Sequence, residues 1–312
     1  LFEGLKGDEV VDSWTIYSVG GGALANEASR LETPRSIYPL STISEIKEWC
    51  YHEGKTFWEY VSDCEGPEIW DYLDTVWETM CATIQRGLNN DGVLPGGLKV
   101  ARKASTYWVK SKSYTDSLSS RAKIYAYALA TSEENASGGT VVTAPTCGSS
   151  GVMPAVLYHL STSRNFLRIR ILRALATAGL FGNVAKTNSS ISGAEVGCQG
   201  EVGVACAMAA AAACQLFGGT PSQIEYAAEM GLEHHLGLTC DPVCGLVQVP
   251  CIERNAIAAA RAFDANAYAT LSDGSHMVSF DKVVEVMNET GHALPSLYRE
   301  TSEGGLAKRF KR

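Results

Sequence analysis

Apolar and polar residues follow a helical spacing along most of this chain. From Ser41 onward, apolar residues recur every three or four positions, which places them on one face of a helix. Thr220, Pro221 and Gln223 add a local start signal: a capping hydroxyl, a proline at the first helical position and a glutamine at the third. With Ser41 and Thr42 as candidate N-caps, the pattern predicts a helix through residue 53, and further helices over residues 67–88, 114–134, 165–183, 221–235, 251–268 and 279–291, with another after the loop at residues 141–151. We therefore expect a mainly α fold.

The chain before Ser41 has a different pattern. Residues 8–26 alternate apolar and polar side chains well enough for one or two strands, which Gly20 to Gly22 would close. So short a β segment does not form an independent sheet, and we expect it to pair with a partner outside this chain. Residues 31–40, with Pro34 and Pro39, are expected to be a linker. The predicted organisation is a strand-like segment over residues 1–30 and a helical domain over residues 31–312.

The stretch from Asn188 to Ala213 is the most unusual in composition. It begins with hydroxyl and amide side chains and ends in an alanine block, which predicts a closely packed helix. Between these parts lie four glycines, one cysteine and two carboxylates: Gly193, Glu195, Gly197, Cys198, Gly200, Glu201 and Gly203. Glycine is unfavourable inside helices, so this density indicates a backbone that comes close to a ligand or to another helix.

Composition narrows the class of protein. At 312 residues the chain can bury one large core, and 46% hydrophobic with 19% charged residues is typical of a soluble protein. The formal net charge of −8 argues against a nucleic-acid partner, because phosphate binding requires a basic surface. No window approaches the roughly 20 apolar residues of a membrane span, and the first residues lack the pattern of a signal peptide. We therefore expect a cytoplasmic protein with no membrane or nucleic-acid partner.

Ten cysteines are many for a chain of this length. Without a signal peptide they are not expected to form disulfides, which leaves metal binding, catalysis or core packing. Cys198, Cys240 and Cys251 each lie among glycines or prolines at a predicted loop–helix junction, where a helix N-terminus favours a thiolate. Their separations of 42 and 11 residues match no zinc-finger or ferredoxin spacing, so the pattern leaves metal binding open and does not exclude Cys206 or Cys244. Three others lie in apolar or aromatic surroundings of helical pattern and are expected to be core or surface thiols: Cys50, Cys64 and Cys81.

Several longer motifs resemble one enzyme family. They are SISGAEVGCQGEVGVAC, EHHLGLTCDPV, QVPCIERNAIA, TAPT and the segment from LSDG to YRETSEGGLA. Together they resemble the catalytic (α) domain of iron–sulfur-dependent L-serine dehydratases, also called L-serine ammonia-lyases, and the likeness extends from about Asp8 to Leu306. The resemblance implies a mostly helical catalytic domain with an oxygen-labile 4Fe–4S cluster. It also implies that Cys198, Cys240 and Cys251 ligate this cluster and leave one iron open.

The resemblance implies a lyase that converts L-serine into pyruvate and ammonia. An iron without a protein thiolate can act as a Lewis acid on the substrate hydroxyl, while a base removes the α-proton and a cation holds the carboxylate. The candidate bases, in order, are Lys186, His234 and Asp241. Each has a structural alternative: a surface charge for Lys186, an orienting group for His234 and a turn cap for Asp241.

The substrate carboxylate and amine need partners as well. Arg254 lies three residues after Cys251, about one helical turn, and a guanidinium binds a carboxylate through two parallel hydrogen bonds. We therefore expect Arg254 to hold the substrate carboxylate. Ser190, Asn188 and Thr146 are candidates for hydrogen bonds to the substrate, although hydroxyls close to glycines also cap helices.

Three features differ from the family pattern. Longer members begin with a regulatory domain that carries a Ser-Ser-Ser-His-Thr motif, and this string is absent here. We therefore expect a regulatory β domain or subunit as a partner, and we expect residues 1–30 to be the end of that domain or a linker. The chain also lacks an initiator methionine, so we expect it to be a fragment or a processed piece. Some members end with a cysteine that folds back onto the open iron, whereas this chain ends in KRFKR. In the TAPT loop, Cys147 stands where other members often carry asparagine. A homo-oligomer is also expected.

Other classes of protein remain as alternatives. A related cluster-dependent lyase would act on L-threonine or L-cysteine, and a non-catalytic iron–sulfur redox sensor would use the same cysteines. A pyridoxal-phosphate dehydratase would use Lys186 as the Schiff base and Gly20 to Gly22 as a phosphate loop, but that fold needs alternating strands and helices. A structural zinc protein would bind its metal through Cys198, Cys240, Cys251 and a histidine.

Overall fold

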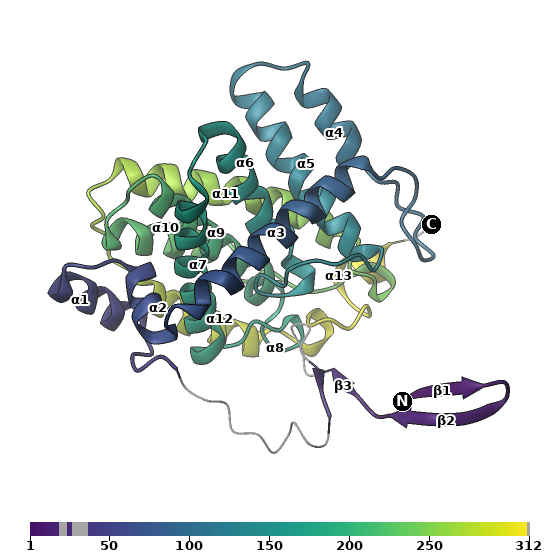
Figure 1. Cartoon of the computed structure of the whole chain (residues 1–312). Helices are drawn as coiled ribbons and strands as arrows, with labels where there is room; N and C mark the ends of the chain where they lie inside the picture. Colours follow the sequence, from purple (N-terminus) through teal and green to yellow (C-terminus); the bar gives the residue numbers. More distant parts are fainter. Residues whose placement is uncertain (19–23, 27–36, 311–312) are drawn as a thin grey trace.

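The chain forms a body of packed helices with a small β region at its N-terminal end (Figure 1). The computed structural model describes residues 1–18, 24–26 and 37–310. The longer helices are α1 (Ile43–Glu53), α2 (Phe57–Glu65), α3 (Glu68–Asn89), α4 (Ala104–Ser111), α5 (Asp116–Ala136), α6 (Val152–Arg164), α7 (Arg168–Asn188), α9 (Val204–Leu216), α10 (Pro221–Glu233), α11 (Cys251–Leu271) and α12 (Phe280–Ala293). The shorter ones are α8 (Gly193–Val196) and α13 (Gly305–Arg309). The predicted mainly α fold is confirmed.

Helix α9 lies at the centre of this body. Its residues from Val204 to Cys214 are all buried, and the run of small side chains lets α6, α7, α10 and α11 pack against it (Figure 1). Helix α10 comes close at Gly231, where an added Cβ atom would lie 2.9 Å from the Cα atom of Ala207. The predicted closely packed alanine helix is therefore confirmed, and its N-terminal end is buried inside the protein.

Local capping signals set several helix starts. Thr42 caps α1 and Thr220 caps α10, each in a reciprocal capping box with the residue three positions later. Of the two candidate caps Ser41 and Thr42, Thr42 is therefore the one that starts α1, and the predicted start at Thr220 and the helical structure in the other predicted ranges are confirmed. Helices α2 and α4 were not predicted, because nine and eight residues span only about two turns and give a weak periodic signal.

The N-terminal β region consists of short antiparallel pairs. Strand β1 (Phe2–Lys6) pairs with β2 (Glu9–Trp14), and β3 (Tyr17–Ser18) pairs with β4 (Leu24–Ala25). Strand structure within residues 8–26 is thus confirmed, while β1 lies before the predicted range. Strands β1 and β2 bond to each other within the chain, and the expected pairing with a partner outside the chain stays a prediction. Figure 1 shows their hairpin projecting away from the helices.

Some sequence predictions fall outside the described residues. These are Gly20 to Gly22, the boundary between residues 30 and 31, and the part of the linker that holds Pro34, whereas Pro39 lies in the coil before α1. Among the residues that the structure does describe, no helix is both long and apolar enough to cross a lipid bilayer.

Candidate active site

The chain enters α9 through an irregular segment, residues 189–203. After α7 ends, one turn of helix forms α8, Gly197 adopts a left-handed φ of 75°, and Cys198 precedes a π turn over Gln199–Gly203. This π turn runs directly into α9. π turns are rare and frequently occur at functional sites. The segment therefore holds Cys198 at the buried N-terminal end of the central helix.

The glycines of this segment allow other loops to come close. A Cβ atom on Gly197 would lie 2.7 Å from the carbonyl oxygen of Leu238, and one on Gly193 would lie 2.8 Å from Glu201 Oε2 and 3.0 Å from Cys240 Sγ. Real Cβ atoms do not approach other atoms this closely. The glycines therefore permit close packing of the chain's own loops, and Gly193 in particular leaves room for the side chains of the site.

Three loops bring Cys198, Cys240 and Cys251 into one buried region. Cys198 precedes the π turn, Cys251 is the first residue of α11, and Cys240 lies in the loop after α10. Backbone hydrogen bonds fix the Cys240 loop: its N–H donates to the Tyr298 carbonyl oxygen at 2.8 Å, and its own carbonyl oxygen accepts from the Glu300 N–H. All three cysteines are buried, and the predicted loop–helix junction is found at Cys251, which begins α11.

The three thiols are electrostatically coupled. A hydrogen bond with the Cys240 side chain lowers the pKa of the Cys198 thiol to about 7 against the effect of its burial, and Arg254 contributes in the same direction. The same hydrogen bond and burial raise the pKa of Cys240, while burial raises the pKa of Cys251 to about 12. Cys198 is therefore the thiol of this set that loses its proton most readily.

The thiols are not arranged for a single metal ion. Within residues 1–18, 24–26 and 37–310, no three Cys, His, Asp or Glu side chains converge closely enough to hold one ion. The Cys240 side chain contributes most to the lowered pKa of Cys198, and repulsion from Cys198 contributes to the raised pKa of Cys251. The three thiols therefore share one electrostatic environment without forming a site for one ion.

Arg254, which is partly buried, and the buried Asp241 form a pair next to these thiols. The Arg254 Nη1 atom donates to the Thr239 carbonyl oxygen at 2.6 Å, and its Nη2 atom lies 3.7 Å from Asp241 Oδ1. Asp241 also accepts hydrogen bonds from the Thr239 hydroxyl at 3.0 Å and from the Leu306 N–H. Because these contacts occupy both carboxylate oxygens of Asp241, its geometry fixes the Cys240 loop and the orientation of Arg254.

Thr146 contacts a carboxylate that the sequence analysis did not assign to the site. Its hydroxyl donates to Glu201 Oε1 at 2.9 Å, and Glu201 Oε2 lies 3.8 Å from Cys240 Sγ. Glu201 belongs to the π turn and has no cationic partner in the described part of the chain. Burial, reinforced by repulsion from Cys198, raises the pKa of Glu201 to about 8. Its place three residues after Cys198, in a run of glycines, was the only local signal of this role.

Orphaned polar atoms mark the same region. Ser150 Oγ and Gln248 Oε1 are buried without a hydrogen-bond partner in the described structure. Gln248 lies three residues before Cys251, and the loop of Ser150 is tied to α11 because Asn255 Nδ2 donates to the Gly148 carbonyl oxygen. Buried polar atoms are nearly always satisfied, so unpaired ones indicate positions where a ligand or water binds.

Three other predicted residues lie at the end of α7 and just after it. Asn188 Nδ2 donates to the Ser41 carbonyl oxygen at 2.8 Å and so ties α7 to the start of α1. Ser190 Oγ accepts from the Ser192 N–H at 3.0 Å, which shapes the turn before α8. Lys186 is exposed and lines a pocket of about 360 Å³ beside the TAPT loop. In the described chain, no hydrogen bond or ion pair joins any of these side chains to a cysteine.

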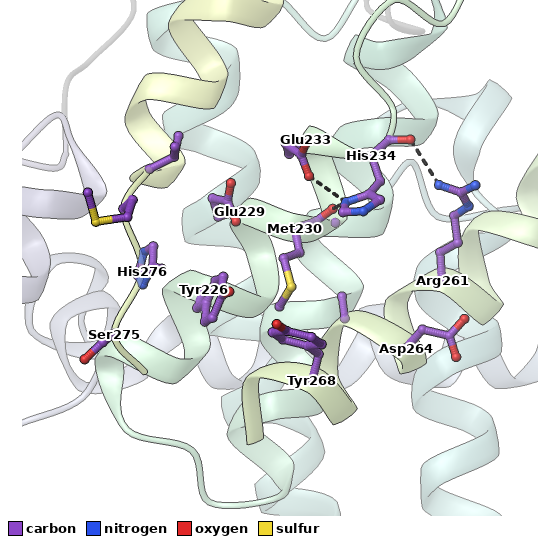
Figure 2. A pocket seen from close by; sticks show the side chains of 14 residues that line it. Tyr226, Glu229, Met230, Glu233, His234, Arg261, Asp264, Tyr268, Ser275 and His276 are labelled. Carbon is purple, nitrogen blue, oxygen red and sulfur yellow. Dashed lines mark hydrogen bonds and ion pairs between the residues drawn. The ribbon is translucent and has the colours of Figure 1, made fainter. Parts of the chain in front are cut away.

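His234 points into a different cavity. It is exposed, and its Nδ1 atom contacts the Met230 carbonyl oxygen at 3.0 Å and Glu233 Oε2 at 2.7 Å. Figure 2 shows the ring at the edge of a cavity of about 830 Å³ between α10, α11 and residues 275–278. His234 also borders a pocket of about 400 Å³ that Arg254 lines. None of the three clustered cysteines lines either cavity.

The fold and site together define a helical protein with a buried, thiol-rich centre at the ends of its helices. A family model described as the serine dehydratase alpha chain matches residues 22–307. The chain therefore belongs to the serine dehydratase alpha chain family.

Curated relatives agree with this assignment. L-serine dehydratase 1 of Escherichia coli (strain K12) is 47% identical over 319 aligned residues, which cover 97% of this chain and 70% of the relative. The L-serine dehydratase of Streptomyces coelicolor is 46% identical, over 97% of this chain and 69% of the relative. That of Haemophilus influenzae is 44% identical, over 94% of this chain and 68% of the relative.

Proposed function

We propose that this chain catalyses the deamination of L-serine to pyruvate and ammonia and is a lyase. The observation that carries the proposal is the cluster of three buried cysteines, Cys198, Cys240 and Cys251, with Arg254 one helical turn after the last of them. The similarity to L-serine dehydratases over nearly the whole chain supports the same activity. L-Serine is accordingly the proposed small-molecule substrate.

The proposed cofactor is a 4Fe–4S cluster held by Cys198, Cys240 and Cys251. An all-thiol donor set suits iron–sulfur clusters, and a cluster offers a separate iron atom to each sulfur atom where the described residues form no single-ion site. The orphaned Gln248 oxygen, three residues before Cys251, and the orphaned Ser150 hydroxyl, on the loop that Asn255 ties to α11, fit a site that holds a ligand. When bound, such a cluster supplies a Lewis acid toward the β-hydroxyl of serine.

Arg254 binds the carboxylate of serine in this proposal. Its guanidinium has five N–H donors, and the Thr239 carbonyl oxygen and Asp241 engage only part of them. The contact with Asp241 and the burial of the stem hold the planar group in one orientation. A fixed guanidinium can therefore offer two parallel hydrogen bonds to a carboxylate.

Glu201 accepts the N–H donors of the serine α-ammonium group. Its carboxylate lies 3.8 Å from Cys240 Sγ and 2.9 Å from the Thr146 hydroxyl, which holds it in place. No Lys or Arg offsets this buried group among the described residues, so a cationic substrate would relieve its desolvation. Ser190 and Asn188 remain weaker candidates for substrate contact, because both side chains already bond to backbone groups.

The elimination requires one proton transfer from carbon. A base removes the α-proton, the β-hydroxyl leaves with a proton as water, and the resulting aminoacrylate tautomerises and hydrolyses to pyruvate and ammonia. Of Lys186, His234 and Asp241, the candidate base nearest the cysteines is Asp241, which is buried beside Arg254 and Cys240 and would have to release one of the hydrogen bonds that its two oxygens accept. Lys186 and His234 are exposed and have no contact with the cysteines in the described chain.

A regulatory β domain or subunit is the proposed macromolecular partner. The β1–β2 hairpin exposes Phe2, Leu5, Val11 and Trp14, which offer an apolar surface for such a partner. A homo-oligomer stays a prediction, and the sedimentation coefficient of the purified protein tests it.

Anaerobic purification of the full chain tests the proposed function. We expect a brown protein with about equal amounts of iron and acid-labile sulfide, which forms pyruvate from L-serine. A colourless protein that contains zinc, or a yellow protein that contains pyridoxal phosphate, would contradict the cofactor. Iron without pyruvate formation would instead favour the redox sensor.

A further inference from the structure

The largest cavity among those described lies away from the cysteines, and the proposed function does not use it. It has a volume of about 830 Å³, within the range of small-molecule sites. Its walls come from α10, α11 and the extended segment at residues 275–278, as Figure 2 shows. None of Cys198, Cys240 and Cys251 lines it.

One carboxylate in this cavity has no partner. Glu229 is only 6% exposed, yet it makes no hydrogen bond or ion pair with any residue in the described chain. Its acidic neighbours are compensated: Glu233 contacts His234 at 2.7 Å, and Asp264 contacts Arg121 at 3.2 Å. The carboxylate oxygens of Glu229 are not among the fully buried atoms without a partner, so they face the cavity, where a cation from outside the chain can pair with them.

Glu225, one turn earlier on α10, shows what a satisfied carboxylate looks like on the same helix. It is fully buried, but it pairs with the Lys47 ammonium group and accepts from the Phe280 N–H. Glu229 has neither kind of partner. Burial and repulsion from Glu233 and Glu225 raise the pKa of Glu229 to about 7, which agrees with a carboxylate that lacks a cation.

Aromatic rings form a wall next to Glu229. Tyr226 stacks on His276 with ring centroids 4.5 Å apart. Tyr226 and Tyr268 pack edge to face, with ring centroids 6.0 Å apart. The Met230 side chain and the exposed Met277 side chain add apolar surface. Aromatic faces attract cations and also pack against apolar groups.

We propose that this cavity binds a small organic cation, namely a primary ammonium compound with an apolar or aromatic body. The ammonium group pairs with Glu229, and the body packs against Tyr226, Tyr268 and Met230. Both free amines and amino acids carry this chemistry. In Figure 2, Arg261 lies beyond Met230 and His234 as seen from Glu229. Its guanidinium would therefore contact only a ligand that also carries a carboxylate.

Phenethylamine and 2-phenylethanol are matched probes for this site, because they differ only in an ammonium group and a hydroxyl group. Isothermal titration calorimetry on the purified full chain should show phenethylamine binding at least tenfold more tightly than 2-phenylethanol. L-Phenylalanine distinguishes the two sources of the ammonium group. Tighter binding of L-phenylalanine than of phenethylamine identifies amino acids as the ligand class, and weaker binding identifies free amines.

Two glutamine variants separate Glu229 from its neighbour on the same helix. Glu229→Gln should lower the affinity for phenethylamine at least tenfold and remove the preference over 2-phenylethanol. Glu233→Gln should keep both, because Glu233 already contacts His234. Tyr268→Leu, at an exposed position that tolerates substitution, should weaken phenethylamine binding several-fold and provides a second test if Glu229→Gln does not fold.

Several outcomes would overturn the proposal. It fails if the wild-type protein binds neither probe, or if Glu229→Gln keeps the preference for the ammonium compound. It also fails if a second copy of the chain fills the cavity. In that case the protein would be a dimer that Glu229→Gln dissociates, and phenethylamine would not bind to the dimer. Binding that Cys198→Ser abolishes would place the probe at the cysteine site instead.

Discussion

Helix α9 and the segment that leads into it are consecutive in the chain but have opposite character. Inside α9, Cys206 Sγ donates to the Ala258 carbonyl oxygen and Cys214 contacts Thr270, and burial raises their pKa values to about 12 and about 11. Only six residues before α9 begins, the pKa of Cys198 is lowered to about 7. The same type of side chain is inert in the regular helix and ionisable at its irregular entrance.

The difference lies in what surrounds each sulfur atom. The regular backbone of α9 satisfies its own polar groups, and the polar groups that Cys206 and Cys214 contact, the Ala258 carbonyl oxygen and the Thr270 hydroxyl, are neutral. The loops at its N-terminal end bring a second thiol and a guanidinium to Cys198. Chemistry in this protein is therefore concentrated where regular structure ends, and the following substitutions test that contrast.

The largest effect on iron content and activity should come from replacing the cysteines of the irregular region, compared with replacing a cysteine inside α9. Cys198→Ser, Cys240→Ser or Cys251→Ser should each abolish both iron binding and pyruvate formation, because a serine hydroxyl is a poor ligand for iron. Cys214→Ala, within α9, should keep both, as should Cys64→Ser and Cys81→Ser. Iron analysis and a pyruvate assay on anaerobic protein provide the measurements. A full complement of iron in Cys240→Ser would refute the ligand set.

Removal of the Glu201 charge should have the next largest effect. Glu201→Gln should lower kcat/KM for L-serine about 100-fold, or about 2.7 kcal/mol, because the ammonium group loses its ionic partner. L-Glycerate has a hydroxyl in place of the amine, so its inhibition constant should change little. The exposed Glu195 on α8 is the matched control, and Glu195→Gln should behave like the wild-type protein. Equal losses for serine and glycerate would mean that Glu201 only supports the loop.

A smaller effect is expected at Arg254. Arg254→Lys keeps the positive charge but loses the planar, two-pronged donor, so kcat/KM for L-serine should fall about tenfold. The iron content should not change, because Arg254 is not a proposed ligand. Arg121→Lys, at a surface ion pair, should leave turnover unaltered. Unchanged turnover in Arg254→Lys would assign this residue to the stability of the Cys240 loop alone.

The same contrast explains what could be predicted from the sequence. The start of α1 at Thr42 and the alanine helix α9 depend on signals within a few residues, so the sequence was sufficient for both. Glu201 was missed because its role depends on the approach of Thr146, 55 positions earlier in the chain. Asn188 was selected for its place beside the glycines, yet its amide bonds to Ser41, 147 positions away. Local patterns carry no information about such distant contacts.

The smallest expected effect comes from a pair of glycines that sharpens the contrast. Gly179 lies inside α7 with no atom near the position of an added Cβ, so Gly179→Ala should raise the free energy of unfolding by about 0.5–1 kcal/mol through its helix propensity. Gly193→Ala places a methyl group against Glu201 and Cys240, and should lower that free energy by about 1–3 kcal/mol and reduce iron content. Urea unfolding and iron analysis measure both. If Gly193→Ala matched the wild-type protein in both measurements, the loops around Cys198 would not be as closely packed as the structure indicates.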